Sequence, residues 1–113
     1  MNDIVDALTN VLEERRGADA NSSYVASLYA AGLDQMLKKV AEEAGETLIA
    51  AKNASGSNRD EALIGEVADL WFHTMVLLVH LGQRPVWVLD ELARRFGVSG
   101  LTEKAARTRS QID

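Results

Sequence analysis

The 113-residue chain has no cysteine, a single proline and no long apolar run, and each absence excludes a class of protein. Without cysteine there is no disulfide, no thiolate zinc site and no cysteine nucleophile. The longest apolar run, residues 75–79, is far too short to cross a bilayer, and the acidic start of the chain is unlike a signal peptide. We therefore expect a cytoplasmic protein that does not bind membranes.

The chain carries a formal net charge of −5, which argues against binding nucleic acid through a basic surface. An acidic protein can still bind phosphates when a metal ion bridges the two. Hydrophobic residues make up 47% of the sequence, so residues 1–113 can form one domain with a core. A domain of this size leaves much surface exposed, and pairing with a second copy would cover more of it.

Apolar residues recur at spacings of three and four almost throughout, which predicts an all-α fold. Glycines and the lone proline divide the pattern into helices that form a bundle of four to five. The tail, residues 98–113, is polar and either carries one short helix or orders only with a ligand or partner. The expected helices cover residues 3–16, a stretch from a Ser22 or Ser23 cap to about residue 31, and residues 33–52, 60–81 and 85–96.

Three acids lie close together on the helix expected over residues 33–52. At about 100° per residue, Glu43 and Glu46 fall on one shoulder of an apolar stripe, whereas Glu42 points to the far side. Taken alone, such a group of acids is usually a solvated helix surface. The apolar stripe, which we expect to face the core, consists of Leu33, Met36, Leu37, Val40, Ala44, Thr47, Leu48 and Ala51.

The helix expected over residues 60–81 is apolar on nearly every side, so we predict that it is buried on most sides. Its ionisable residues beyond the first turn, Glu66, Asp69, His73 and His80, project onto one narrow stripe. Buried acids need partners, because an uncompensated buried charge is very costly. This stretch of helix has no lysine or arginine, so the partner must come from elsewhere.

A short loop joins these two helices, so they are expected to pack as an antiparallel hairpin. Glu43 and Glu46 would then face Glu66 and Asp69, and their mutual repulsion calls for a cation. Oxygen ligands without cysteine select Mg²⁺, or Mn²⁺ as a substitute, and such an ion commonly binds phosphates. Lys39 is the best-placed lysine for an outlying phosphate, although it could equally be a simple ion-pair partner of Glu43.

These acids, in the pattern Glu42-Glu43-x-x-Glu46 followed by Glu66-x-x-Asp69, resemble the signature of the MazG-like all-α nucleoside triphosphate pyrophosphatases. Two further segments point within that superfamily to the phosphoribosyl-ATP pyrophosphatases of histidine biosynthesis. They are Ser23-Tyr24-Val25-Ala26-Ser27-Leu28-Tyr29 and Ser99-Gly100-Leu101-x-Glu103-Lys104-Ala105-x-Arg107.

The resemblance implies hydrolysis of the α–β phosphoanhydride of 1-(5-phosphoribosyl)-ATP, the second step of the pathway. It implies that Glu43, Glu46, Glu66 and Asp69 hold Mg²⁺ and carry the catalysis. It also implies a homodimer whose active site borrows residues across the interface. The substrate contacts expected from the matched segments and the nearby charges are Ser23, Tyr24, Lys39, Glu42, Asn53, Lys104 and Arg107.

Other functions remain open at this point. A house-cleaning pyrophosphatase for damaged or deoxy nucleotides would share the same metal site. A non-enzymatic helical binding module could carry the acids as a groove. A di-iron protein is less compatible, because it would require Glu-x-x-His motifs on two helices and the sequence has none.

Overall fold

The structure, a computed structural model, describes residues 3–56 and 58–97 of the chain. These residues form five α-helices and no β-strand, which confirms the all-α fold class. The observed helix bounds differ from the expected ones by at most two residues, whereas the polar tail lies outside the described residues. The helices are α1 (Asp3–Glu14), α2 (Tyr24–Ala31), α3 (Leu33–Lys52), α4 (Glu61–His80) and α5 (Pro85–Phe96).

Local capping interactions explain where the central helices begin. The Ser23 hydroxyl accepts a hydrogen bond of 3.1 Å from the Ala26 amide and caps α2. The Asp60 carboxylate accepts one of 3.0 Å from the Leu63 amide and caps α4. Each cap satisfies an amide that the first turn of a helix leaves unpaired. Between α2 and α3, Gly32 has φ +94°, a conformation that side chains disfavour, so the chain can turn there.

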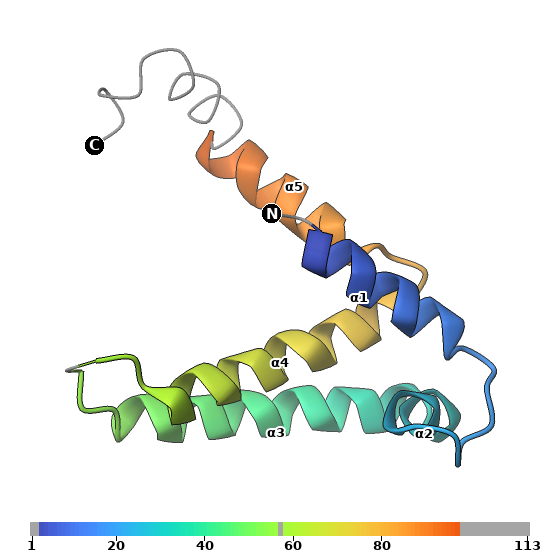
Figure 1. Cartoon of the computed structure of the whole chain (residues 1–113), viewed down its shortest axis with the longest axis horizontal. Helices are drawn as coiled ribbons and strands as arrows, with labels where there is room; N and C mark the ends of the chain where they lie inside the picture. Colours follow the sequence, from blue (N-terminus) through green and yellow to red (C-terminus); the bar gives the residue numbers. More distant parts are fainter. Residues whose placement is uncertain (1–2, 57, 98–113) are drawn as a thin grey trace.

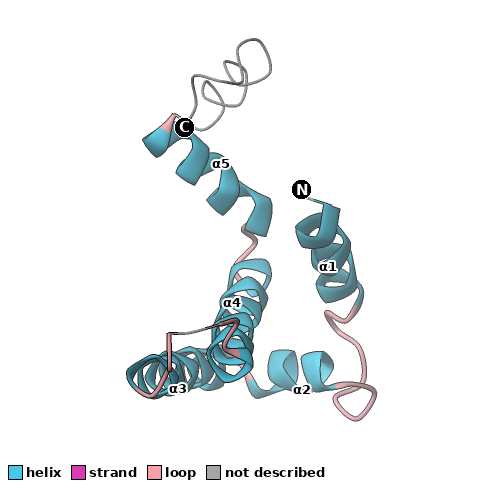
Figure 2. Cartoon of the chain, turned by 60° about the vertical axis from the view of Figure 1, so that its left-hand side comes forward, coloured by secondary structure: helices cyan, strands magenta, loops and turns pink. Residues whose placement is uncertain are grey.

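The helices form two arms that meet in a V (Figure 1). Helices α3 and α4 pack side by side and antiparallel as the expected hairpin. Helix α2 lies across the start of α3, and α1 and α5 form the second arm. Figure 2 shows that α1 and α5 diverge from one another toward their outer ends. Most inter-helix packing is therefore concentrated in the hairpin and at the junction of the two arms.

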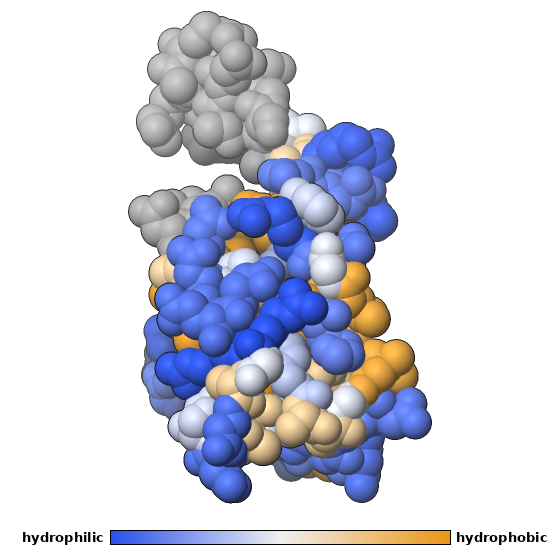
Figure 3. Space-filling view, turned by 90° about the vertical axis from the view of Figure 1, so that its right-hand side faces the viewer, coloured by the Kyte–Doolittle hydropathy of each residue, from blue (hydrophilic) through white to orange (hydrophobic). Residues whose placement is uncertain are grey.

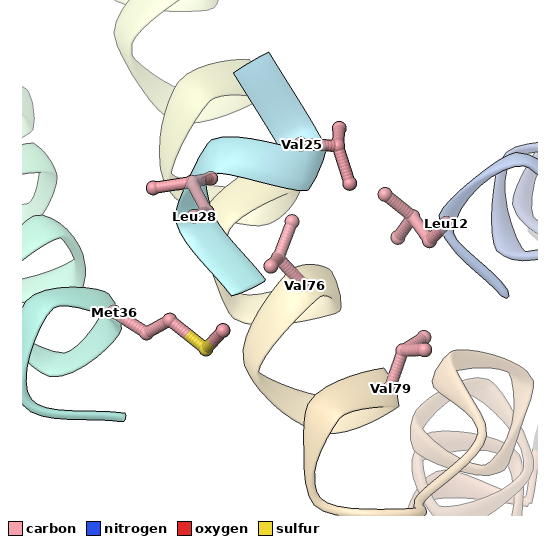
Figure 4. Packing of buried hydrophobic residues seen from close by; sticks show 6 residues of the cluster. All are labelled: Leu12, Val25, Leu28, Met36, Val76 and Val79. Atoms are coloured by element: carbon pink, nitrogen blue, oxygen red, sulfur yellow. The ribbon is translucent and has the colours of Figure 1, made fainter. Parts of the chain in front are cut away.

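The apolar core lies at that junction, where side chains from α1, α2, α3 and α4 converge (Figure 4). Four helices therefore depend on the same small set of contacts. Val76 and Val79 place the second half of α4 at the centre of this cluster. The buried members are Leu12, Val25, Leu28, Met36, Val76 and Val79.

The expectation that α4 is buried on most sides is wrong for the single chain. Trp71 on α4 is 68% exposed, and Ile64 is exposed as well. Among the described residues, α4 is the one helix long and apolar enough to cross a membrane, a test that core helices of soluble proteins also pass. Apolar patches also lie open between hydrophilic regions on the face seen in Figure 3. One chain of this size has too few helices to cover α4.

Only part of the expected apolar stripe on α3 packs against other helices. Met36 is buried, but Leu37 is exposed and Leu48 is 71% exposed. Glu43, expected on the shoulder of the stripe, is instead only 6% exposed. Helix α3 has apolar side chains on more than one side, and α4 covers only one of them. The packed side is the one that carries Glu43, which brings an acid into the interior.

Candidate functional site

Three carboxylates from the hairpin meet at one point between its helices. Glu43 and Glu46 come from α3, one turn apart, and Glu66 comes from α4. Each offers an oxygen atom, and these oxygens all lie within 4.8 Å of one another. Glu43 is buried, Glu66 is half-buried and Glu46 is exposed. The set therefore has a closed inner side and an open outer side from which a ligand can approach.

Two buried oxygen atoms of the set have no partner in the described part of the chain. Oε1 of Glu43 and Oε1 of Glu66 are buried and have no hydrogen-bond partner among the described residues. The pKa of Glu66 is raised, first by desolvation, then by its hydrogen bond to Glu46 and by the charges of Glu46, Asp69 and Glu43. Unpaired buried oxygens and crowded like charges are both relieved by a bound cation. The three carboxylates can thus hold a metal ion.

Asp69, the fourth predicted ligand, lies one turn after Glu66 on α4 and is exposed. It does not belong to the set of oxygens that lie within 4.8 Å of one another. Its negative charge nevertheless contributes to the raised pKa of Glu66, so the two side chains are electrostatic neighbours. Asp69 thus lies at the open edge of the site.

A threonine that the sequence assigned to the apolar stripe connects the two helices at the site. The hydroxyl of Thr47 lies 2.8 Å from the Glu43 carbonyl oxygen and 3.2 Å from that of Glu66. One hydroxyl proton is therefore positioned to bond either carbonyl, one on α3 and one on α4. The threonine fixes the main chain beneath two of the three carboxylates. No signal in the sequence pointed to this role, because a threonine also fits on an apolar helix face.

Lys39 and Glu42 form the charged border of the site on α3. The ammonium of Lys39 lies 3.3 Å from a Glu42 carboxylate oxygen and 3.7 Å from Oε2 of Glu43. The pKa of Lys39 is raised, mainly by its hydrogen bond to Glu42, with smaller contributions from Tyr24 and both glutamates. Glu42 is exposed, in agreement with its projected direction, and contacts the site through the lysine.

The predicted contacts at the start of α2 have different roles. Ser23 uses its hydroxyl to cap the helix, which gives that residue a structural function. The hydroxyl of Tyr24 lies 2.9 Å from Nε2 of His73, whose Nδ1 lies 2.8 Å from the Asp69 carbonyl oxygen. His73, which the sequence places on the ionisable stripe of α4, is buried. The pairing with Tyr24 was not foreseen, because it joins residues 49 positions apart.

The remaining predicted contacts are farther from this arrangement or cannot be placed. Asn53 is exposed and ends α3 as its C-cap residue. Lys104 and Arg107 lie outside the described residues.

A groove of about 300 Å³ lies elsewhere, between α1, α4 and α5. Apolar side chains form nearly all of its lining, so it offers a nucleotide little polar recognition. Trp71, Met75 and Leu92 are among these side chains, and none of the acids discussed above lines it. This groove is consequently a poor alternative to the carboxylate site for binding a phosphate compound.

A comparison with known protein families shows which family the chain belongs to. The sequence model of the phosphoribosyl-ATP pyrophosphohydrolase family matches residues 5–96. The chain belongs to this family. It is accordingly a hydrolase that acts on a phosphoanhydride bond, as the resemblance implied. The matched region contains α2 to α5 and all three clustered carboxylates.

Proposed function

We propose that the protein hydrolyses the α–β phosphoanhydride of 1-(5-phosphoribosyl)-ATP in a Mg²⁺-dependent reaction, which gives phosphoribosyl-AMP and pyrophosphate. This is the second step of L-histidine biosynthesis. The observation that carries the proposal is the set of Glu43, Glu46 and Glu66 oxygens within 4.8 Å of one another, in a member of this family. Two unpaired buried oxygens and a carboxyl with a raised pKa support a divalent cation at that point.

Glu43, Glu46, Glu66 and Asp69 would hold the ion, with Mn²⁺ as a possible substitute for Mg²⁺. All-oxygen donors match the preference of hard divalent cations, and the donor set contains neither sulfur nor imidazole. When bound, the ion supplies positive charge to the phosphate oxygens and favours deprotonation of the attacking water. Glu43 anchors the set because it is buried, whereas the exposed Glu46 and Asp69 can adjust to an incoming phosphate.

Lys39 would bind a phosphate oxygen next to the ion. Its ammonium group is held beside the site by Glu42 and Glu43 rather than extended freely into solvent. Glu42 would keep the lysine in place and bind a ligand or a water molecule. Ser23, Tyr24, Asn53, Lys104 and Arg107 are proposed as further substrate contacts, and the Ser23 hydroxyl also caps α2.

Pyrophosphate release tests this proposal directly. The purified protein is incubated with phosphoribosyl-ATP and Mg²⁺, then with Mg²⁺ removed by chelation, then with Mn²⁺ added back. We expect turnover with Mg²⁺, loss on chelation and partial or full recovery with Mn²⁺. Faster hydrolysis of deoxynucleoside triphosphates than of phosphoribosyl-ATP would instead identify a house-cleaning pyrophosphatase. No hydrolysis of either substrate, beside an active relative, would leave only a binding function.

We further propose that residues 1–113 form one domain that acts as a cytoplasmic homodimer. The support is the large apolar area that one chain leaves open, including Ile49 on α3 and Ile64 and Trp71 on α4. A second copy would bury this area without requiring a membrane. Sedimentation of the wild type and of Trp71→Glu tests it, with a dimer expected for the first and a shift to monomer for the second. A monomeric wild type at micromolar concentration contradicts the proposal.

A further inference from the structure

The hydroxyl of Thr47 contacts main-chain atoms on both helices of the site. Its oxygen lies 2.8 Å from the carbonyl oxygen of Glu43, one turn earlier on α3, and 3.2 Å from that of Glu66 on α4. A carbonyl oxygen can only accept a hydrogen bond, so the threonine donates its single proton between these two acceptors. The first contact stays within α3, as threonine hydroxyls in helices often do, whereas the second crosses to α4. Thr47 therefore links the helices at the residue that α4 contributes to the carboxylate cluster.

This link is important because the apolar core lies farther along the hairpin. The buried core takes Met36 from α3 and Val76 and Val79 from α4 (Figure 4). Val76 follows Glu66 by almost three helical turns, a distance of about 15 Å along the helix axis. The core therefore does not fix the spacing of the helices at the carboxylates. That spacing depends on local contacts, and the Thr47 hydroxyl makes one of them.

The carboxylates themselves oppose a close approach of the helices. Glu43 and Glu46 on α3 lie close to Glu66 on α4, and like charges at such a separation repel until a cation is bound. This repulsion favours a wider spacing between α3 and α4. The Thr47 hydroxyl acts against it and donates to main-chain carbonyl oxygens, so it does not compete with an ion for the carboxylate oxygens.

Small changes in this spacing distinguish divalent ions by size. The three clustered oxygens lie within 4.8 Å of one another. Mg²⁺ binds oxygen at about 2.0–2.1 Å in a nearly ideal octahedron, whereas Ca²⁺ accepts about 2.3–2.6 Å and a flexible geometry. Oxygens on opposite sides of the ion are therefore about 4.2 Å apart for Mg²⁺ and about 4.6–5.2 Å apart for Ca²⁺. A firmly held hairpin favours the smaller ion, and a loosened hairpin loses that preference.

We propose that Thr47 is a positioning residue whose hydroxyl holds α4 against α3 beneath the carboxylates and thereby gives the site its preference for Mg²⁺ over Ca²⁺. Thr47 acts through the positions of Glu43 and Glu66 and supplies no ligand of its own. The inference rests on the proposed function, since it requires a Mg²⁺ site among these carboxylates. It assigns the choice of ion to a neutral residue that lies beside the acids.

Ion binding to the substrate-free protein tests this role without a measurement of turnover. The Kd values for Mg²⁺ and Ca²⁺ are obtained from the rise in unfolding temperature with ion concentration, at fixed protein concentration and ionic strength. Thr47→Val keeps the shape of the side chain and removes the hydroxyl. We expect it to weaken Mg²⁺ binding about threefold to tenfold, the effect of one neutral hydrogen bond, and to change Ca²⁺ binding little. Thr47→Ser keeps the hydroxyl and should retain the wild-type ratio of the two Kd values.

Thr9→Val is the matched control. The Thr9 hydroxyl is buried and donates over 2.7 Å to the Val5 carbonyl oxygen within α1, a helix that carries none of the three clustered carboxylates. Its loss should lower stability in the absence of ions and leave the ratio of Kd values at the wild-type figure. Glu66→Gln should weaken the binding of both ions, which would locate the binding at the carboxylates. If Thr47→Val does not fold, Thr47→Ala removes the hydroxyl without placing a methyl group against the carbonyl oxygens.

The possible results separate the inference from the proposed function. A wild-type ratio of Kd values in the folded variant without the Thr47 hydroxyl overturns the inference alone. The same holds if Thr47→Ser or Thr9→Val changes the ratio as much, or if wild type binds Ca²⁺ more tightly than Mg²⁺. Wild type that binds neither ion overturns the proposed metal site and this inference with it. Wild type that binds Mg²⁺ but does not hydrolyse phosphoribosyl-ATP overturns the proposed reaction and leaves the role of Thr47 to the ratio.

Discussion

The two halves of α4 lie on one continuous helix but have opposite surroundings. The first half carries Glu66 and Asp69 beside α3 and leaves Ile64 exposed. The second half buries Val76 and Val79 against α1, α2 and α3. The buried contacts that stabilise the fold are thus concentrated in the half of α4 without acids. The candidate site lies in the other half, which few side chains cover. Such a separation lets a site hold repelling charges while the core stabilises the fold elsewhere.

The largest expected effect is on turnover and comes from the acidic half. Asp69→Asn or Glu66→Gln should lower kcat by at least about a hundredfold, because each removes a proposed metal ligand. Glu61→Gln on the same helix is the control, since Glu61 pairs with Arg59 on the exposed surface at 2.7 Å. Pyrophosphate release under saturating substrate measures the effect.

The same Asp69→Asn variant also tests whether the two halves are independent. Without metal it should be as stable as wild type or more so, because one of several clustered negative charges is gone. Thermal unfolding in the presence of a chelator measures this. A large loss of stability in that experiment would mean that the acids contribute to the core after all.

The next effect belongs to the apolar half. Leu12→Ala should lower the free energy of unfolding by about 2–4 kcal/mol, because Leu12 is 0% exposed and its removal leaves a cavity. Urea unfolding at one fixed protein concentration gives the value, since dimer formation would shift the midpoint. Ile4→Ala on the same helix should change stability little, because Ile4 is 72% exposed. Activity at low temperature should survive in both variants.

A smaller effect is expected where the acidic half begins. Asp60→Ala should cost about 1 kcal/mol, because the Leu63 amide loses its capping acceptor. Asp60→Asn keeps an oxygen acceptor and should retain most of the stability. Chemical unfolding of the two variants side by side separates the cap from the charge. Equal losses in both would indicate that the negative charge, rather than the hydrogen bond, stabilises the start of α4.

The smallest effect is a change in pH dependence. The pKa of Glu66 is raised above its ordinary 4.5 in the folded protein, so ionisation of this group opposes folding. Metal-free wild type should therefore lose stability relative to Glu66→Gln as the pH rises from 4.5 through the higher folded pKa. Below 4.5 the difference should become constant, because Glu66 is protonated in both states. Unfolding curves at a series of pH values measure the difference.

Added Mg²⁺ should reverse the order at neutral pH. Wild type gains stability by binding the ion in its folded state, whereas Glu66→Gln gains little. A difference between the two proteins that does not change with pH would show that Glu66 titrates like a surface acid. That result would also weaken the case for a crowded carboxylate site.

Sequence patterns were sufficient for the helices and for the hairpin that joins the acids. Capping residues, glycines and apolar spacing are local signals, and α3 and α5 begin and end where these signals predict. The register of α3 against α4 was less well predicted. The helical projection placed Glu43 on the shoulder of the apolar stripe, yet its side chain is buried. Helix α3 has more apolar surface than one neighbouring helix can cover, and the side that packs is the one that carries Glu43.

The sequence by itself determined the all-α fold, the helix bounds and the acids of the candidate site, since spacing and capping act between residues close in the chain. Only the tertiary structure decided which acids meet. It brought Glu43, Glu46 and Glu66 together, left Asp69 at the edge and paired Tyr24 with His73. These contacts depend on how helices rotate and approach one another. Burial of side chains distant in sequence fixes that rotation, and no local pattern encodes it.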